Sequence, residues 1–301
     1  MNINEKQKIK RSLNFYLENG LNEVIMSSKK TLKNKKNNIS QEISIKTNFE
    51  QKKITKIFDE NKVDLSKSAN IKTISSSSDA IGILAKKNLE DSDIKKFIPI
   101  SKIIEDAKNS AKKCNNIFEL KKAVENFDGC NLKKIATNTV FCDGNPDSKI
   151  MVIGEAPGNH EDLQGIPFCG ESGKLLDAMF QAIDLDRSKI YITNVIFWRP
   201  PGNRKPTEEE LSVCKPFVEK HIELINPKLI ILVGSTAMSA ILGISDPVTG
   251  IRGKIIKYRM SNIDKEVDSF VIFHPSYLMR QSSKKRIAWR DMLEIEKIIK
   301  Q

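Results

Sequence analysis

Apolar residues in the C-terminal half of the chain follow two alternating patterns. Three segments, 174–183, 208–225 and 235–242, have apolar residues at helical spacing. Between and around them lie four short, nearly continuous apolar runs typical of buried strands, at 150–153, 190–196, 229–233 and 270–273. Such strands alternating with helices indicate an α/β fold whose parallel sheet is covered on both faces. The loops that follow the strands are then expected to meet at one edge of the sheet.

The N-terminal part of the chain has weaker patterns. Residues 1–26 carry one apolar face and predict a short amphipathic helix. Residues 27–78 are dominated by Lys, Asn and Ser, so we predict a disordered, low-complexity linker there. Helical patterns at 79–88 and 103–127 predict a helical lead-in over residues 79–128. The α/β domain is then expected to occupy residues 129–301.

The distribution of charge adds information about partners. The 301 residues carry a formal net charge of +12, to which residues 1–100 contribute +8, residues 151–250 contribute −4 and residues 251–301 contribute +6. Basic ends around an acidic, loop-rich centre suit an enzyme that acts on a polyanion. An AT-rich coding bias explains the lysine and asparagine content of the first 100 residues equally well.

The sequence also bears on the cellular compartment. It has no apolar run long enough to span a bilayer, and Met1–Lys6 does not begin the apolar core of a signal peptide. The five cysteines have irregular spacing and do not suggest a disulfide framework. We therefore expect a cytoplasmic protein in a reducing environment, without a membrane partner.

Reactive side chains follow three of the predicted strands. Glu155 and Phe168 lie in the loop after the first strand, Asn194 lies at the end of the second, and His274 follows the fourth. An aromatic face can stack on a base, and an amide both donates and accepts, so it can read the edge of a pyrimidine. A carboxylate with a histidine suits general-base and electrostatic catalysis. Their shared position at strand ends favours a ligand site.

Each of these residues also has an ordinary structural explanation. Phe168 can fill a small core beneath its loop, Asn194 can cap a turn, and His274 can be a core histidine. Glu155 can pair with Arg199. The loop after the first strand contains neither G-x-G-x-x-G nor G-x-x-x-x-G-K, so the common dinucleotide and P-loop sites are not indicated.

Three separated motifs together resemble the family 4 uracil-DNA glycosylases. The first is Gly154-Glu-Ala-Pro-Gly158 with Glu161-Asp162 and Gly165-Ile-Pro-Phe168; the others are Asn194–Arg204 and His274–Arg280. The resemblance covers roughly residues 125–300. It implies a three-layer α/β/α sandwich with a central four-stranded parallel sheet. It also implies hydrolysis of the N-glycosidic bond of deoxyuridine in DNA after base flipping, the first step of base-excision repair.

The resemblance assigns roles to the residues by position. Glu155 is expected to act on the attacking water or to stabilise the sugar cation, with Glu161 as the alternative carboxylate, and His274 is expected to hydrogen-bond O2 of uracil. Phe168 is expected to stack on the base and Asn194 to read its edge. The substrate-binding set is completed by Gly154, Ala156 and Gly158. Family 1 enzymes carry a thymine-excluding tyrosine where Gly158 stands, so thymine must be excluded here by another feature.

The third motif and its neighbours are expected to contact DNA. In the family, the segment after the histidine enters the minor groove, so Tyr277, Leu278 and Met279 are expected to wedge beside the flipped nucleotide. Lys284 and its neighbours can also be a solvated helix start. The residues expected to bind DNA are Arg199, Asn203, Arg204, Ser276, Tyr277, Leu278, Arg280, Lys284 and Arg286.

The chain departs from the family at the iron–sulfur cluster. Most family 4 enzymes carry a four-iron, four-sulfur cluster on four cysteines. Here Cys130 and Cys214 match the second and fourth, whereas Phe127 and Trp198 occupy the first and third positions. Because such a cluster needs four thiolates, we expect neither a cofactor nor a metal. Cys142 stays open as a substitute ligand. The pattern resembles a bacterial branch of the family that lacks the cluster.

Other functions remain compatible with the sequence. One is a non-catalytic DNA-binding protein that recognises uracil or abasic sites with the same pocket. Another is a glycosylase with broader base specificity, against which Asn194 argues because it suits a pyrimidine edge. A branch that becomes covalently attached to DNA has an added basic loop, and the stretch 248–254 lacks such an insertion. We expect a monomer that acts on uracil-containing DNA. The sequence favours neither single-stranded nor double-stranded DNA.

Overall fold

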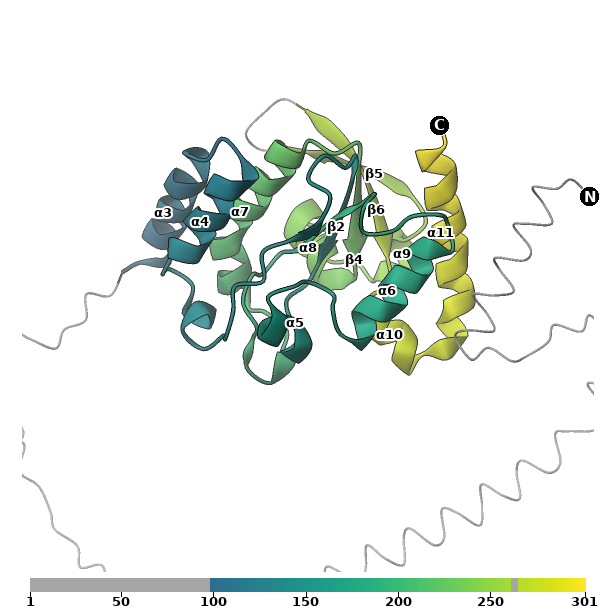
Figure 1. Ribbon diagram of the computed structural model, residues 1–301, viewed down its shortest axis with the longest axis horizontal. Coiled ribbons are helices and arrows are strands. Elements are labelled where there is room, and N and C mark those ends of the chain that lie inside the picture. Colours follow the sequence, from purple (N-terminus) through teal and green to yellow (C-terminus); the bar gives the residue numbers. More distant parts are fainter. Residues whose placement is uncertain (1–97, 261–264) are drawn as a thin grey trace, which may run out of the picture. The chain divides into compact units, whose positions relative to one another are not determined.

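The computed structural model describes residues 98–260 and 265–301. The predicted helix at 1–26, the linker at 27–78 and the helix at 79–88 lie outside the described residues. Figure 1 shows a central sheet with helices on both faces, which confirms the predicted three-layer α/β/α architecture. Within the described part of the chain, no helix is both long and apolar enough to cross a membrane.

The central sheet has six strands in the order β1-β3-β2-β4-β6-β5. Its four central strands are parallel, as expected, while β1 and β5 pair antiparallel at the two edges. Both edge strands were missed in the sequence because β1 has two residues and β5 is mostly exposed. The strands are β1 Asp143–Gly144, β2 Ile150–Gly154, β3 Tyr191–Asn194, β4 Leu229–Val233, β5 Ile255–Arg259 and β6 Glu266–Ile272.

The predicted segments 174–183, 208–225 and 235–242 are helical in the structure, whereas the other helices of the second half were not predicted and the lead-in differs. The single helix predicted at 103–127 is wrong, because Asn116 caps a new helix by accepting a hydrogen bond from the Glu119 N–H. The α-helices are α3 Ile100–Lys112, α4 Ile117–Asn126, α5 Asn159–Gln164, α6 Glu171–Gln181, α7 Glu208–Ile225, α8 Ser235–Leu242, α9 Val248–Ile251, α10 Pro275–Arg280 and α11 Lys285–Ile299. Short 3-10 turns are η2 Asn131–Lys134, η3 Pro201–Asn203 and η4 Ser282–Lys284.

Successive strand residues point into two separate cores. Met151 and Ile153 belong to the core shared with α3, α4, α7 and α8. Ile150 and Val152 belong to the opposite core, which α6, α10 and α11 cover. Because side chains alternate across a strand, burial on both faces requires a continuous apolar run. The two helical layers pack against the sheet on both faces, and the sheet places the strand ends that carry the polar loops side by side.

A buried histidine lies in the first of these cores. His221 on α7 is fully buried, and its Nε2 lies 2.8 Å from the Tyr191 hydroxyl. Burial lowers the pKa of His221 from 6.5 to about 3, so the folded protein holds this side chain neutral. Between these two pH values the unfolded chain binds more protons than the folded chain. The contribution of His221 to stability is therefore present above pH 6.5 and is lost as the pH falls toward 3.

We expect the free energy of unfolding to decrease on acidification, with His221 contributing up to about 1.4 kcal/mol per pH unit below its unfolded pKa. Denaturant unfolding at several pH values between 7 and 5 measures this slope. His221→Phe should make the slope shallower because the titrating group is gone. Tyr191→Phe removes the hydroxyl partner but keeps the histidine, so it should retain the slope. An unchanged slope in His221→Phe would show that other groups cause the acid sensitivity.

Candidate active site

The carboxyl ends of three strands meet at a single cavity. Glu155 follows β2, Asn194 is the last residue of β3, and His274 follows β6. Together with Phe168, from the loop between α5 and α6, they line a cavity of about 400 Å³. A second hollow of about 530 Å³ shares Glu155 and His274 and extends toward α8 and α9. The sheet edge thus brings together the four residues on which the sequence interpretation depends.

Phe168 and Asn194 form adjoining walls of the cavity, separated by Gly154. A Cβ atom on Gly154 would lie 2.5 Å from the Phe168 ring and 2.3 Å from Oδ1 of Asn194. Only glycine therefore lets the ring and the amide come this close. Asn194 is buried, and its Oδ1 has no hydrogen-bond partner within the structure. A buried acceptor without a partner is costly, so this oxygen is suited to receive a hydrogen bond from a ligand.

His274 is held in one tautomer by its own helix. It is the N-cap of α10, and its Nδ1 accepts a hydrogen bond from the backbone N–H of Ser276 at 3.2 Å. The Ser276 hydroxyl lies 2.8 Å from the same nitrogen. Burial lowers the pKa of His274 below its usual value, so the ring is neutral near pH 7. Because Nδ1 accepts, the single proton is on Nε2, and this nitrogen is a hydrogen-bond donor.

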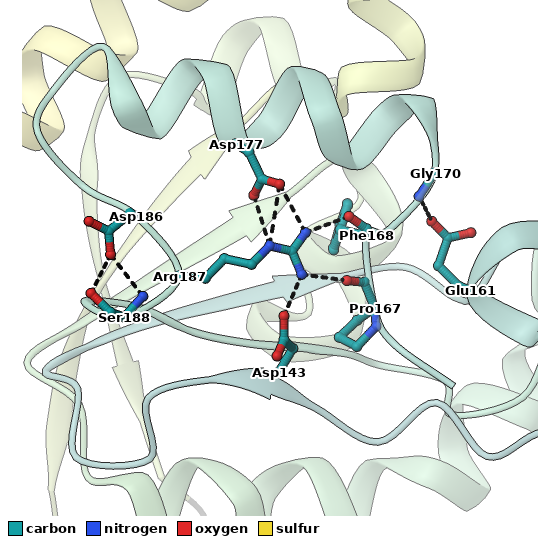
Figure 2. Close-up of polar contacts among 9 residues, drawn as sticks. All are labelled: Asp143, Glu161, Pro167, Phe168, Gly170, Asp177, Asp186, Arg187 and Ser188. Atoms are coloured by element: carbon teal, nitrogen blue, oxygen red, sulfur yellow. Dashed lines mark hydrogen bonds and ion pairs between the residues drawn. The ribbon is translucent and has the colours of Figure 1, made fainter. Parts of the chain in front are cut away.

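The two candidate carboxylates have different surroundings. Glu155 is half-buried, and its carboxylate makes no hydrogen bond or ion pair with the described residues. Both oxygens of Glu161 are occupied, since Oε2 accepts from the Gly158 N–H at 3.0 Å and Oε1 accepts from the Gly170 N–H at 2.8 Å. Figure 2 shows the second of these bonds. Glu155 is thus the carboxylate that is free to act on a ligand, while Glu161 ties two loops together.

The alternative pairing of Glu155 with Arg199 is not present. Arg199 instead donates to Asn203 and to Asn159, both at 2.7 Å. Asp162 is buried and accepts from the backbone N–H groups of residues 137 and 138. These bonds organise the loops around the cavity and leave Glu155 facing it.

Most residues expected to bind DNA surround the cavity. Asn203, Arg204, Ser276 and Arg280 line it, and Tyr277 lines the adjoining hollow.

Two donor nitrogens of Arg204 donate hydrogen bonds to the carboxylate of Glu210, at 2.6 and 2.9 Å. Lys284 and Arg286 lie beyond both cavities, Arg286 on the exposed surface. The substrate-binding expectations Ala156 and Gly158 also fall on the lining of the first cavity.

Leu278 does not lie where the sequence interpretation placed it. Its side chain is completely buried in the core beneath α10, so the expectation that Leu278 wedges into DNA is wrong for this structure. The helical turn of α10 directs residue 278 toward the sheet and residue 279 outward. Met279 is 49% exposed and is the apolar side chain of this helix that reaches the surface. Tyr277 is half-buried against Phe273, with ring centroids 5.2 Å apart.

Arg187, from the loop between α6 and β3, was missed in the sequence. Its guanidinium donates to Asp143 at 2.5 Å and to Asp177 at 3.1 Å, as well as to the backbone carbonyls of Pro167 and Phe168 (Figure 2). These partners lie 10 to 44 residues away along the chain. No local sequence motif predicts contacts between residues so far apart. Arg187 nevertheless holds the backbone of the residue whose ring forms one wall of the cavity.

The four positions that correspond to the cluster ligands of the family all belong to the first core or pack against it. The thiols of Cys130 and Cys214 lie near each other, and the neighbouring Cys214 lowers the pKa of Cys130. The Phe127 ring contacts Phe217 edge-on at a centroid distance of 5.0 Å. The Trp198 side chain is almost completely buried, and its Nε1 donates to the Thr139 hydroxyl at 3.0 Å. Apolar rings therefore occupy two of the four ligand positions.

Comparison with known proteins agrees with this geometry. Residues 141–293 match the model of the Uracil DNA glycosylase superfamily. A type-4 uracil-DNA glycosylase from Thermotoga maritima is 39% identical over 59% of this chain and 91% of that protein. One from Sulfurisphaera tokodaii is 34% identical over 61% of this chain and 85% of that protein. One from Archaeoglobus fulgidus is 39% identical over 50% of this chain and 76% of that protein.

Proposed function

Because this chain belongs to the uracil-DNA glycosylase superfamily, we propose how its own residues carry out the reaction of that family. The chain is a uracil-DNA glycosylase, a hydrolase of DNA repair that acts on uracil-containing DNA. The observation that carries the assignment of roles is the cavity itself. It joins an aromatic face, a buried amide oxygen without a partner, a histidine Nε2–H donor and one free carboxylate.

Recognition of uracil follows from the walls of the cavity. The base must leave the DNA stack before its glycosidic bond can be reached. The flipped uracil stacks on Phe168, and its N3–H meets the unpartnered Oδ1 of Asn194. The amide nitrogen of Asn194 donates to O4. Cytosine offers an acceptor at N3 and an amino group at C4, so the same amide orientation disfavours it.

Bond cleavage divides charge between the sugar and the base. As the C1′–N1 bond breaks, its electron pair leaves with uracil and the sugar becomes an oxocarbenium-like cation. The Nε2–H of His274 donates to O2, where negative charge builds. Glu155 stabilises the cation and accepts the proton from the water whose oxygen then bonds to C1′. Glu161 acts by holding Gly158 and Gly170, and so positions the loop.

The experiment that tests this function is excision from a labelled oligonucleotide with one uracil, followed by alkali cleavage of the abasic site. Strand cleavage that depends on the uracil supports the glycosylase. Binding without cleavage would instead support the alternative function, a protein that recognises uracil or abasic sites without turnover. Oligonucleotides containing hypoxanthine or xanthine in place of uracil test for broader base specificity.

The chain is proposed to work without an iron–sulfur cluster, like a bacterial branch of its family. The support is the chemistry of the donor set, since Phe127 and Trp198 offer no ligand atom for iron and two thiols are too few for such a cluster. No group of three or more His, Cys, Asp or Glu side chains within residues 98–260 and 265–301 is arranged to hold a metal. Burial raises the pKa of the Cys142 thiol, the open substitute, and so disfavours the thiolate that binds iron.

Purified protein is therefore expected to contain only trace iron and no acid-labile sulfide, and to be active in that state. Analysis of iron and acid-labile sulfide tests the composition, and the excision assay on the same sample tests the activity. The double variant Cys130→Ser with Cys214→Ser should keep its activity, because apolar packing holds the loop in place of a cluster. Stoichiometric iron that disappears in this double variant would overturn the proposal.

The oligomeric state and the cellular compartment of the protein are also part of the proposal. We propose a monomer, and the support is that the residues assigned to uracil recognition and bond cleavage all lie in one chain. A cytoplasmic location is supported by the substrate, cellular DNA, and by the odd number of cysteines.

A further inference from the structure

We propose that Arg187 is a positioning residue for uracil recognition, which acts by fixing the backbone of Phe168. The inference rests on the proposed function, because it assigns a role to Arg187 at the same cavity. Phe168 has a φ of +52°, a left-handed conformation that is uncommon for a residue other than glycine. Such a conformation is strained and persists only where surrounding contacts hold it.

The surroundings of Phe168 leave its peptide groups little freedom. The Phe168 carbonyl oxygen lies so close to α6 that a Cβ atom on Gly173 would be 1.6 Å from it. Arg187 donates to this same carbonyl and, through Nη1, to the carbonyl of Pro167 at 3.1 Å. On the other side of the turn, Glu161 accepts from the Gly170 N–H. A cation therefore holds the carbonyls at the start of the turn, and an anion holds the amide at its end.

Arg187 connects this turn to two other parts of the fold. Its Nε donates to Asp177 on α6, and its Nη1 donates to Asp143 on β1 (Figure 2). The guanidinium side chain is only 26% exposed, so these ion pairs are shielded more than surface pairs are. The planar fork of arginine satisfies four acceptors in different directions at once. A lysine ammonium has three donors around one point and cannot reproduce this geometry.

The position of the Phe168 ring matters because its neighbours are fixed separately. The ring lies 5.9 Å from the His274 ring, at an interplanar angle of 31°. Asn194 is held by β3, and His274 is held by the cap of α10. The distance from the Phe168 ring to Asn194 and His274 therefore depends on the loop that Arg187 holds. A displacement of about 1 Å in a binding wall can cost up to roughly 10²-fold in rate.

The test is Arg187→Lys, with free uracil as a probe of the stacking pocket and DNA carrying an abasic site as a probe of the remaining surface. We expect inhibition by uracil to weaken about tenfold and kcat/KM for excision to fall about 10- to 100-fold. The affinity for abasic DNA should stay within about twofold, because the basic surface is unchanged. Asp177→Asn removes the negative charge and one acceptor oxygen of a partner of Arg187 and leaves Phe168 itself unchanged, so it should produce the same changes with a smaller magnitude.

Arg252→Lys is the matched control. Arg252 pairs with the buried Asp291 and donates to the Ile287 carbonyl at 3.2 Å, and none of these groups touches Phe168. This control should lower the melting temperature while uracil inhibition stays unchanged. Equal inhibition in Arg187→Lys and wild type would overturn the inference, as would an equal loss in Arg187→Lys and Arg252→Lys. If Arg187→Lys does not fold, the same comparison of uracil inhibition with the wild type and with Arg252→Lys is made for Asp177→Asn. Failure of the proposed function can be distinguished from failure of this inference, because in the first case the wild-type protein itself would not excise uracil.

Discussion

Replacing Glu155 by glutamine is expected to slow uracil excision by about 10²- to 10³-fold. Glu155 is the carboxylate of the cavity that has no hydrogen bond or ion pair with the described residues, so its charge is available to the sugar cation that forms during the reaction. Glutamine keeps the size of the side chain but removes this charge and the ability to accept a proton. The charge is most useful when the sugar is cationic, so kcat should fall much more than KM rises.

Glu161→Gln is the matched control for this variant. Glutamine has one oxygen, so it can no longer accept from both Gly158 and Gly170. We expect a lower melting temperature and a smaller decrease in kcat than for Glu155→Gln. Single-turnover excision at saturating enzyme separates the chemical step from binding and product release. A larger decrease in Glu161→Gln than in Glu155→Gln would assign the catalytic charge to Glu161 and contradict the present assignment.

Replacing Asn194 by alanine is expected to reduce kcat/KM for uracil by about 10²- to 10³-fold. The variant loses two hydrogen bonds to the base and leaves the polar edge of uracil unpaired in a buried site. Each unpaired group costs roughly 1–3 kcal/mol, and the loss applies to the transition state as well as to the bound substrate. Excision from an oligonucleotide with one uracil measures this ratio, and free uracil should inhibit the variant more weakly than the wild type.

Asn194→Asp tests the direction of the hydrogen bonds separately from their number. An ionised aspartate only accepts, so it still suits N3–H but repels the O4 acceptor of uracil. Uracil excision should therefore fall, whereas the amino group of cytosine becomes the better match at this position. Binding of DNA with an abasic site should be the same in both variants and in the wild type. Unchanged uracil excision in Asn194→Ala would mean that the base is read by another side chain.

The strongest local patterns predicted the fold well. The run at 229–233 has the same bounds as β4, and the helical segment 235–242 has the same bounds as α8. A strand buried on both faces must be apolar throughout, so its sequence carries its own signal. The edge strand β5 has exposed and buried positions mixed, and β1 is too short for any pattern. The helix break before Asn116 depended on a single capping side chain inside a pattern that otherwise continues.

The residues at the strand ends were identifiable because parallel topology brings such loops together. Glu155, Phe168, Asn194 and His274 do line a single cavity. The orientation of α10 was not identifiable in this way. A wedge role for Leu278 followed from its place after His274, but the turn of the helix against the sheet buries it and exposes Met279. Helical phase depends on packing against the core, which a motif of six residues does not encode.

The sequence by itself determined the α/β class, the four parallel strands and three helices of the second half, and the chemical groups at the sheet edge. It did so because these features depend on local apolar patterns and on one topological rule. Only the tertiary structure decided which carboxylate is free, which histidine nitrogen carries the proton, and how Phe168 is held. These properties depend on hydrogen bonds made by Glu161, His274 and Arg187 with partners that the fold brings into reach. For Arg187 those partners lie as far as 44 residues away along the chain.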